Sequence, residues 1–268
     1  MTFRPGHRQK KAIFLDGTSD YLSVTPTGTG AANINPNGDE AFSVSAWVRP
    51  QNNFTASTLT KTHPIFNRHR TTGSWAGLYF RLFEDGTVNF SFSTDYGGAS
   101  NGVEAKSGAG AWYGQINQWG LYVATYDGSE TSAGCFVYQN GLDVSETRGT
   151  TGTPANMSDG TGTAGNSAAI GAYSNGWGSS TTRLEGGICG VGFWSAALTP
   201  AQVEELYFQN AALPSPGKIS DHSAYSSLVA YWIGDDPSDT SSTIQDTKGS
   251  NNMASTSLTS GQLFAVKT

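Results

Sequence analysis

Apolar and polar side chains alternate with a period of two residues along much of the chain. Between residues 41 and 48 the positions on one face are all apolar: Phe42, Val44, Ala46 and Val48. Such alternation is typical of a β-strand with one buried face. Comparable runs predict further strands at 12–15, 21–24, 78–83, 88–92, 119–126, 134–138, 142–145, 168–172, 184–194 and 228–233.

Two pairs of these strands are joined by residues that favour tight reversals. Asp85-Gly86 separates 78–83 from 88–92, and Asn140-Gly141 separates 134–138 from 142–145. Both dipeptides tolerate the positive φ angles of short hairpin turns. We therefore predict two β-hairpins.

One segment has the signals of a helix. Thr199 supplies an N-cap hydroxyl, Pro200 suits the first helical position, and Gln202 can reach back to the cap. Apolar residues then recur at helical spacing until Pro214 ends the segment. Many short strands with one short helix predict an all-β fold, a two-sheet antiparallel sandwich. Two stretches rich in Gly, Ser, Thr and Asn, residues 146–167 and 235–261, are expected to be long loops.

Composition agrees with a strand-rich domain and narrows the choice of partners. Charged residues make up 13% of the 268 residues, about half the usual ~25%, so the polar surface is built from Ser, Thr, Asn, Gln and Gly. The net charge of −6 creates no field that attracts phosphate backbones, and we expect no nucleic-acid partner. No apolar run approaches the ~20 residues of a membrane-spanning helix, so we expect no membrane insertion.

The chain ends and the cysteines add two expectations. Residues 1–11 form a basic arm without the apolar core of a signal peptide, and we expect it to dock on an acidic partner surface. Two cysteines are too few for a disulfide scaffold or a zinc site. One bridge between Cys135 and Cys189 is conceivable, but both lie in strand-like segments, which favours two buried free thiols.

Six short motifs in a characteristic order carry a family resemblance across residues 12–208. They are Phe14-Leu15-Asp16-Gly17, Phe42-Ser43-Val44-Ser45-Ala46-Trp47, Trp119 with Tyr126-Asp127-Gly128, Gln139-Asn140-Gly141, Leu184-Glu185-Gly186-Gly187-Ile188, and Leu198-Thr199-Pro200-Ala201-Gln202. Together they resemble the laminin-G-like, concanavalin A-like lectin and glucanase family. The resemblance implies a jelly-roll sandwich over residues 12–212, followed by an extension at 213–268 that packs on it.

A further motif resembles the family but stands in an unusual place. Leu228-Val229-Ala230-Tyr231-Trp232, followed by Asp246-Thr247-Lys248-Gly249, is similar to a lead-in that such domains often carry before their first strand. Here it follows the predicted helix. This order resembles laminin-G-like proteins of bacteriophage particles.

The resemblance implies no required cofactor, but the family often holds a structural calcium. Asp16 and Asp20 at the opening turn are the candidate ligands, because calcium prefers carboxylate and other oxygen ligands. However, Ile188-Cys189-Gly190 stands where the family usually has Ile-Asp-Glu. An alternative of equal weight is that both Asp residues bond nearby backbone within the turn.

Sugar binding in sandwich lectins requires an aromatic face and a few planar polar groups. Aromatic and amide side chains in hydrophilic segments are therefore the candidates for carbohydrate binding: Tyr96, Trp112, Tyr113, Tyr173, Asn175 and Trp177. The competing interpretation is that these rings cap the ends of the sandwich or pack against neighbouring subunits.

An enzyme is not expected. Retaining glycosidases need two carboxyl groups about 5–5.5 Å apart, and the Glu-x-Asp-x-x-Glu spacing of laminarinase-type relatives does not occur here. The four histidines have no accompanying Ser or Cys motif. We expect a non-enzymatic virion structural protein on the particle surface, a capsid decoration or a tail or fibre adhesin. It would associate with other virion proteins and as a homo-oligomer, and would bind host-surface glycans. The alternative is a secreted, extracellular carbohydrate-binding module that is not attached to a particle.

Overall fold

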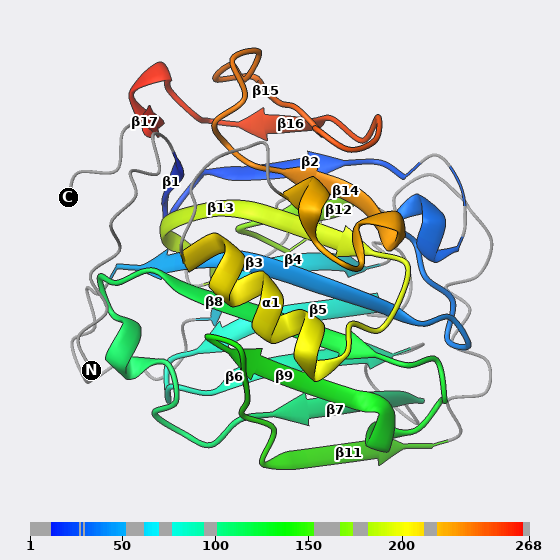
Figure 1. The fold of residues 1–268 in the computed structure, drawn as a ribbon. Helices are drawn as coiled ribbons and strands as arrows, with labels where there is room; N and C mark the ends of the chain where they lie inside the picture. Colours follow the sequence, from blue (N-terminus) through cyan, green and yellow to red (C-terminus); the bar gives the residue numbers. More distant parts are fainter. Residues whose placement is uncertain are drawn as a thin grey trace.

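A computed structural model of the chain describes residues 12–26, 28, 30–51, 62–69, 77–93, 101–152, 167–173, 182–211 and 219–264. Within these ranges the chain forms two antiparallel β-sheets stacked face to face, with one α-helix on the outside (Figure 1). The fold class predicted from the alternation of side chains is therefore confirmed. The basic arm at residues 1–11 lies outside the described residues.

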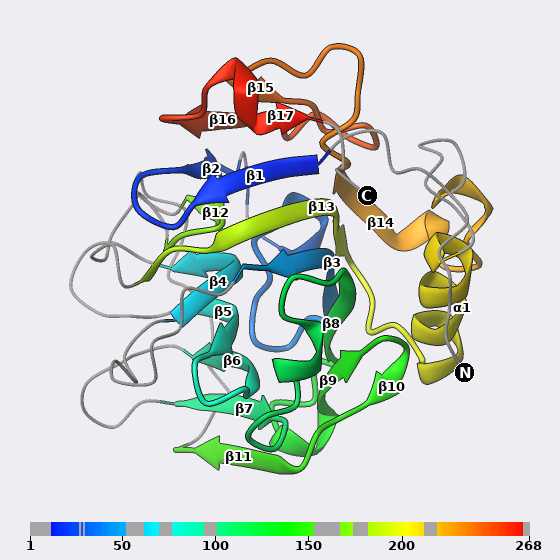
Figure 2. The same ribbon diagram turned by 90° about the vertical axis from the view of Figure 1, so that its left-hand side faces the viewer.

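Sheet A carries the helix on its outer face, and sheet B forms the opposite side of the sandwich (Figure 2). In the described residues the strand order of sheet A is β10 (Leu142–Asp143), β9 (Cys135–Gln139), β8 (Gly120–Tyr126), β3 (Phe42–Pro50), β13 (Glu185–Trp194), β1 (Ala12–Asp16) and β17 (Leu263–Phe264), and β14 (Leu228–Trp232) pairs with β13. The order of sheet B is β11 (Thr147–Thr151), β7 (Gly102–Lys106), β6 (Val88–Ser93), β5 (Gly77–Phe83), β4 (Thr62–His69), β12 (Ala168–Ile170), β2 (Tyr21–Val24), β16 (Met253–Thr256) and β15 (Thr243–Ile244).

The core lies between the two sheets and centres on aromatic rings. The Phe42 ring of sheet A contacts Phe90 and Phe92 of sheet B edge-on, with centroid separations of 5.9 and 5.3 Å. It also stacks on Phe193 at 5.9 Å. All four rings are buried, because the period-two pattern directs them into the space between the layers.

Both predicted hairpins form. β5 pairs with β6 around Gly86, whose φ is +85°, and β9 pairs with β10 around Asn140 and Gly141, with φ of 52° and 85°. Two successive positive φ angles are those of the type I′ turn that Asn-Gly favours.

The predicted helix also forms, as α1 (Pro200–Ala211). The backbone N–H of Thr199 donates to Gln202 Oε1 at 2.9 Å, and the N–H of Gln202 donates to Thr199 Oγ1 at 3.3 Å, which completes the capping box. Val203 and Leu206 then bury one side of α1 in a second apolar cluster against sheet A. Short 3₁₀ turns occur at Ala31–Asn33, Tyr113–Gln115, Ser132–Gly134, Ile219–Asp221, Tyr225–Ser227 and Ser260–Gln262.

The expectation of long loops at residues 146–167 and 235–261 was wrong in part. The first stretch contains β11, an edge strand whose side chains are mostly exposed, so that no apolar alternation marks it. The second contains β15 and β16, which extend sheet B beyond β2. These strands are too short to show an alternating pattern, because each has a single buried apolar residue, Ile244 in β15 and Met253 in β16.

Residues 219–264 contribute to both sheets. β14 pairs with β13 in sheet A, β16 pairs with β2 in sheet B, and β17 pairs with β1. The unusually placed motif lies here. Asp246 Oδ1 accepts hydrogen bonds from the backbone N–H groups of Tyr231, Lys248 and Gly249, which ties the loop to β14. The predicted domain boundary at 212–213 falls outside the described residues.

Cys135 and Cys189 are both buried and free, so the favoured interpretation of two unpaired thiols is confirmed. Burial raises the pKa of the Cys135 thiol above its ordinary value. Among the described residues, no helix combines the length and apolar character needed to cross a bilayer.

Candidate functional site

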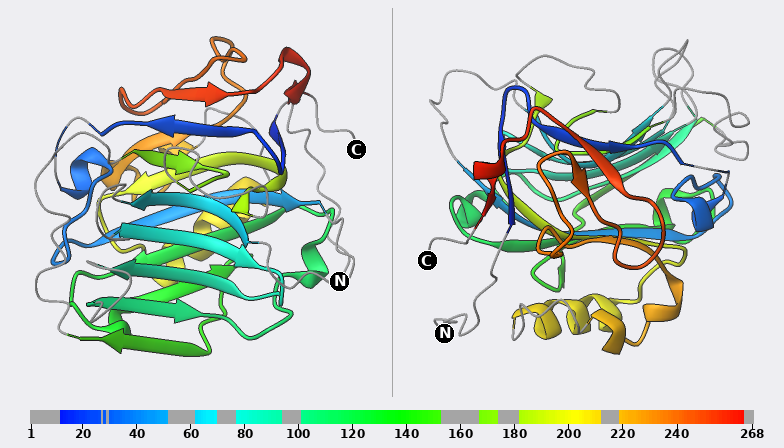
Figure 3. Two further views of the ribbon diagram at one scale, coloured as in Figure 1. Left: turned by 180° about the vertical axis from the view of Figure 1, so that it is seen from behind. Right: turned by 90° about the horizontal axis from the view of Figure 1, so that it is seen from above.

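The outer face of sheet B differs from that of sheet A because no helix of the described residues covers it (Figure 3). On β5, Leu78, Phe80 and Leu82 point into the core. Because successive strand residues face opposite sides, Tyr79, Arg81 and Phe83 share the outer face. On the neighbouring strand β6, Asn89 lies directly opposite Arg81.

Five side chains on this face form a continuous hydrogen-bonded series, which we call the polar row. Its members follow one another in the order Tyr173, Arg81, Asn89, Glu104 and Lys106. Arg81 Nη1 donates to Tyr173 Oη at 3.0 Å, and Arg81 Nε donates to Asn89 Oδ1 at 2.8 Å. Asn89 Nδ2 donates to Glu104 Oε1 at 2.9 Å, and Lys106 Nζ lies 2.9 Å from Glu104 Oε2. The row therefore crosses β5, β6 and β7.

Aromatic rings flank the guanidinium group of this row. Arg81 Cζ lies 5.3 Å from the ring centroid of Tyr79 and 4.7 Å from that of Phe83, within the range of cation–π contacts. The Tyr79 and Tyr173 rings meet edge to face at 5.7 Å. Aromatic surface and fixed planar polar groups thus occur side by side on one sheet face.

The structure brings one of the predicted carbohydrate-binding residues, Tyr173, into the polar row. Tyr96, Asn175 and Trp177 lie outside the described residues. The remaining two candidates, Trp112 and Tyr113, lie in the connection between β7 and β8, which packs against the turn between β5 and β6.

Trp112 and Tyr113 have different surroundings. Trp112 is fully buried in the core, and its Nε1 donates to the backbone oxygen of Phe83 at 2.7 Å. Its ring faces have no area left for a ligand, so we exclude Trp112 from the candidate site. Tyr113 is 45% exposed, and its hydroxyl donates to the backbone oxygen of Glu84.

The opening turn uses its two carboxylates internally. Asp16 Oδ1 accepts the backbone N–H groups of Thr18, Ser19 and Asp20, and Asp16 Oδ2 accepts both nearby hydroxyls. Burial alone would raise the pKa of Asp16, but these hydrogen bonds hold it well below its usual value. Burial, together with the charge of Asp16, raises the pKa of Asp20.

This geometry is the one expected when the two Asp residues bond nearby backbone within the turn. The oxygens of Asp16 already face donors of their own turn, and Asp20 Oδ2 accepts the N–H of Asp16 and the side chain of Gln262. No group of three or more His, Cys, Asp or Glu residues suited to a metal ion occurs in the part of the chain that the structure describes. Calcium binding at Asp16 and Asp20 stays a prediction from the resemblance.

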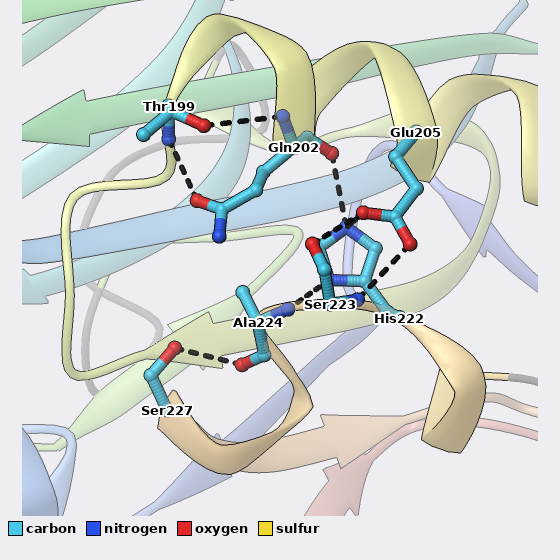
Figure 4. Close-up of polar contacts among 7 residues, drawn as sticks. All are labelled: Thr199, Gln202, Glu205, His222, Ser223, Ala224 and Ser227. Carbon is cyan, nitrogen blue, oxygen red and sulfur yellow. Dashed lines mark hydrogen bonds and ion pairs between the residues drawn. The ribbon is translucent and has the colours of Figure 1, made fainter.

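A Ser, a His and a Glu also meet beneath α1, but their bonds are structural (Figure 4). His222 Nδ1 accepts the backbone N–H of Ala224 at 3.1 Å, and Nε2 lies 2.9 Å from the carbonyl oxygen of Gln202. Ser223 donates to Glu205 rather than to His222. A serine nucleophile requires a base at its hydroxyl, and the two histidine nitrogens are already occupied by backbone groups.

Analysis of the sequence missed four members of the polar row: Arg81, Asn89, Glu104 and Lys106. The signal for two of them was present, since Arg81 and Asn89 occupy polar positions of the predicted hairpin strands. β7, which carries Glu104 and Lys106, was not predicted.

A family model for the concanavalin A-like lectin and glucanase superfamily, of laminin-G type, matches residues 16–204. The chain belongs to this family. Its fold is that of lectin-like carbohydrate-binding domains, which confirms the family resemblance seen in the sequence.

Solved structures show the same fold at low sequence identity. A protein of Bacteroides ovatus ATCC 8483, provisionally described as carbohydrate binding, matches 93% of this chain with 20% identity and a TM-score of 0.55. The match spans 58% of that protein's length. The CBM40 module of a Ruminococcus gnavus IT-sialidase matches 74% of this chain and 97% of its own, with 11% identity and a TM-score of 0.51. The same module bound to α2,6-sialyllactose gives 10% identity and a TM-score of 0.51. Among curated proteins, no significant match was found.

Proposed function

We propose that the protein binds carbohydrate on the outer face of sheet B, at the polar row and the rings beside it. The supporting observation is that the partly exposed rings of Phe83 and Tyr173 lie next to the hydrogen-bonding groups of Arg81. Sugar rings present apolar C–H faces and hydroxyl groups at their edges, and such a surface complements both.

We propose binding without hydrolysis. Within the described part of the polar row, Glu104 is the one carboxylate, and it is engaged by Asn89 and Lys106. Retaining glycosidases require two carboxyl groups about 5–5.5 Å apart. Release of reducing sugar from laminarin or agar-type polymers would contradict this part of the proposal.

A glycan array followed by isothermal titration with the bound glycan tests the proposal. Tyr173→Ala removes a ring and the hydroxyl that accepts from Arg81, and we expect affinity to fall about tenfold or more. Tyr113→Ala is the matched control, because it removes an exposed tyrosine at the β5–β6 turn. An array that stays blank with folded protein would overturn the proposal, and selective loss of binding in the Tyr113 variant would move the site to that turn.

The biological setting is proposed from the sequence resemblance alone. We propose a virion decoration or adhesion protein that associates with other virion proteins and as a homo-oligomer, with a secreted extracellular module as the alternative. Mass spectrometry of purified particles distinguishes the two. Presence of the chain at stoichiometric amounts supports the first, and a soluble monomer absent from particles supports the second.

A further inference from the structure

The charge balance of the polar row centres on Arg81. Of its three charged members, Lys106 and Glu104 neutralise each other at 2.9 Å. Arg81 donates instead to a neutral amide and a neutral phenol. Within the described residues the Arg81 guanidinium therefore has no carboxylate partner, although the whole chain carries −6.

The guanidinium group also keeps unused hydrogen-bond donors. Arginine has five N–H donors. Among the described residues, Asn89 engages the donor on Nε and Tyr173 engages one donor on Nη1, which leaves one donor on Nη1 and both on Nη2. Arg81 is partly exposed on the outer face of sheet B.

The surroundings hold this group in a fixed orientation before any ligand arrives. The bonds to Asn89 and Tyr173 fix two edges of the guanidinium plane, and the rings of Tyr79 and Phe83 lie 5.3 and 4.7 Å from its central carbon. A side chain that is already ordered loses little conformational entropy on binding. A planar fork of N–H donors matches the two oxygens of a carboxylate or of a sulfate ester.

We infer that the site takes an anionic glycan and that Arg81 binds its carboxylate or sulfate group. This inference rests on the proposed carbohydrate binding and adds the class of sugar. The partly exposed rings of Phe83 and Tyr173 would contact the sugar that carries the anionic group, and the Tyr173 hydroxyl would contact one of its hydroxyls. Asn89 is fully buried and holds Arg81 in place.

The test uses the full chain and an array on which the same glycan backbones appear in neutral, carboxylated and sulfated forms. We expect binding to carboxylated or sulfated members at least tenfold above their neutral counterparts, and weaker binding as NaCl concentration rises. Comparison of the carboxylated with the sulfated glycans shows which anionic group is preferred. Methyl esterification of a bound carboxylated glycan should abolish the preference.

Variants separate the charge of Arg81 from the fold. Arg81→Gln should reduce the affinity for the anionic glycan about tenfold or more. Arg81→Lys keeps the charge but not the planar fork of donors, and its affinity should lie between that of the unaltered protein and that of the Gln variant. Arg49→Gln is the matched control, because it changes the net charge equally on β3 of the opposite sheet. Thermal unfolding of each variant verifies that it is folded.

The outcomes distinguish the two proposals. Equal binding of neutral and anionic forms, unaffected by Arg81→Gln, would overturn the inference and leave carbohydrate binding intact. Equal losses in the Arg49 and Arg81 variants would also overturn it, because the effect would then be one of net charge. A blank array would overturn both.

Discussion

At the scale of single residues, Gly86 has two roles in the β5–β6 hairpin. It supplies the positive φ of +85° that the turn requires, and its carbonyl oxygen accepts the backbone N–H of Trp112 at 3.1 Å. The neighbouring Asp85 carbonyl accepts the N–H of Gly110 at 2.7 Å. A Cβ on Gly86 would lie 2.3 Å from the nitrogen and Cα of Gly110. The absence of a side chain therefore lets a second segment pack directly on the turn.

We predict that Gly86→Ala lowers the free energy of unfolding by about 2–4 kcal/mol, since positive φ and a backbone clash both disfavour a side chain. Chemical denaturation measures this change. The matched control is Gly114→Ala, where a Cβ would meet nothing within 4 Å, and we expect a change within about 0.5 kcal/mol. Equal stability of the two variants would show that the turn relaxes without cost.

Trp112 shows why the type of a residue alone does not identify a binding site. Its sequence surroundings of Gly, Ala and Tyr suggest an exposed ring, but the ring is buried and its indole N–H is satisfied by a backbone carbonyl. Only the tertiary structure, which folds this segment back onto the end of β5, distinguishes it from Tyr113.

At the scale of elements, α1 is fixed to the sandwich through His222. The imidazole accepts the backbone N–H of Ala224 and bonds to the carbonyl of Gln202 in the first turn of α1 (Figure 4). Its ring lies 5.1 Å from that of Trp194. One buried side chain thus connects α1, the 219–227 segment and β13.

We predict that His222→Ala lowers the free energy of unfolding by about 2–4 kcal/mol, because it leaves buried backbone groups without partners and opens a cavity. Loss of the near-ultraviolet signal of Trp194 should accompany the change. Ser226→Ala, at an exposed position of the same segment, serves as the control and should be nearly neutral. An unchanged denaturation midpoint for the His222 variant would mean that this contact does not hold α1.

The elements that could be predicted from the sequence are those with a regular pattern or a specific turn. β3, both hairpins and the capped helix have such signals. β4 does not, because Pro64 argues against a central strand, and the structure accommodates it next to a register shift between Pro64 and Phe66. β11 was missed because an exposed edge strand needs no apolar face.

The candidate site depends on strand order, which no local pattern contains. Alternation along β5 places Arg81 on the outer face, but Tyr173 is 92 residues away in the chain. The two meet only because β12 lies two strands from β5 in sheet B. The aromatic candidates were therefore identified singly, and their polar partners were not.

At the scale of the whole molecule, the strands after α1 complete the sandwich. β14 and β17 extend sheet A, whereas β15 and β16 extend sheet B. Trp232 of β14 is fully buried and stacks on Phe66 of sheet B, with ring centroids 6.3 Å apart. The C-terminal strands therefore close the core at the edge where β1 and β2 lie.

We predict that a chain ending at Ala211 does not fold cooperatively, since it would expose the apolar surface that β14 and β16 cover. Circular dichroism and limited proteolysis measure this directly. As a graded comparison, Trp232→Ala in the full chain should remain folded but lose about 3–5 kcal/mol of stability. A sharp unfolding transition of the shortened chain at the midpoint of the full chain would contradict the prediction.

The pairing of β1 with β17 places Ala12 opposite Phe264. The polypeptide thus enters and leaves the sandwich at neighbouring points on one edge. Domains whose ends lie close together can be inserted into a surface loop of another protein, and they also tolerate circular permutation. Because β17 lies at the edge of sheet A, on the side away from β5, β6 and β7, such grafting would leave the polar row facing outward from its carrier.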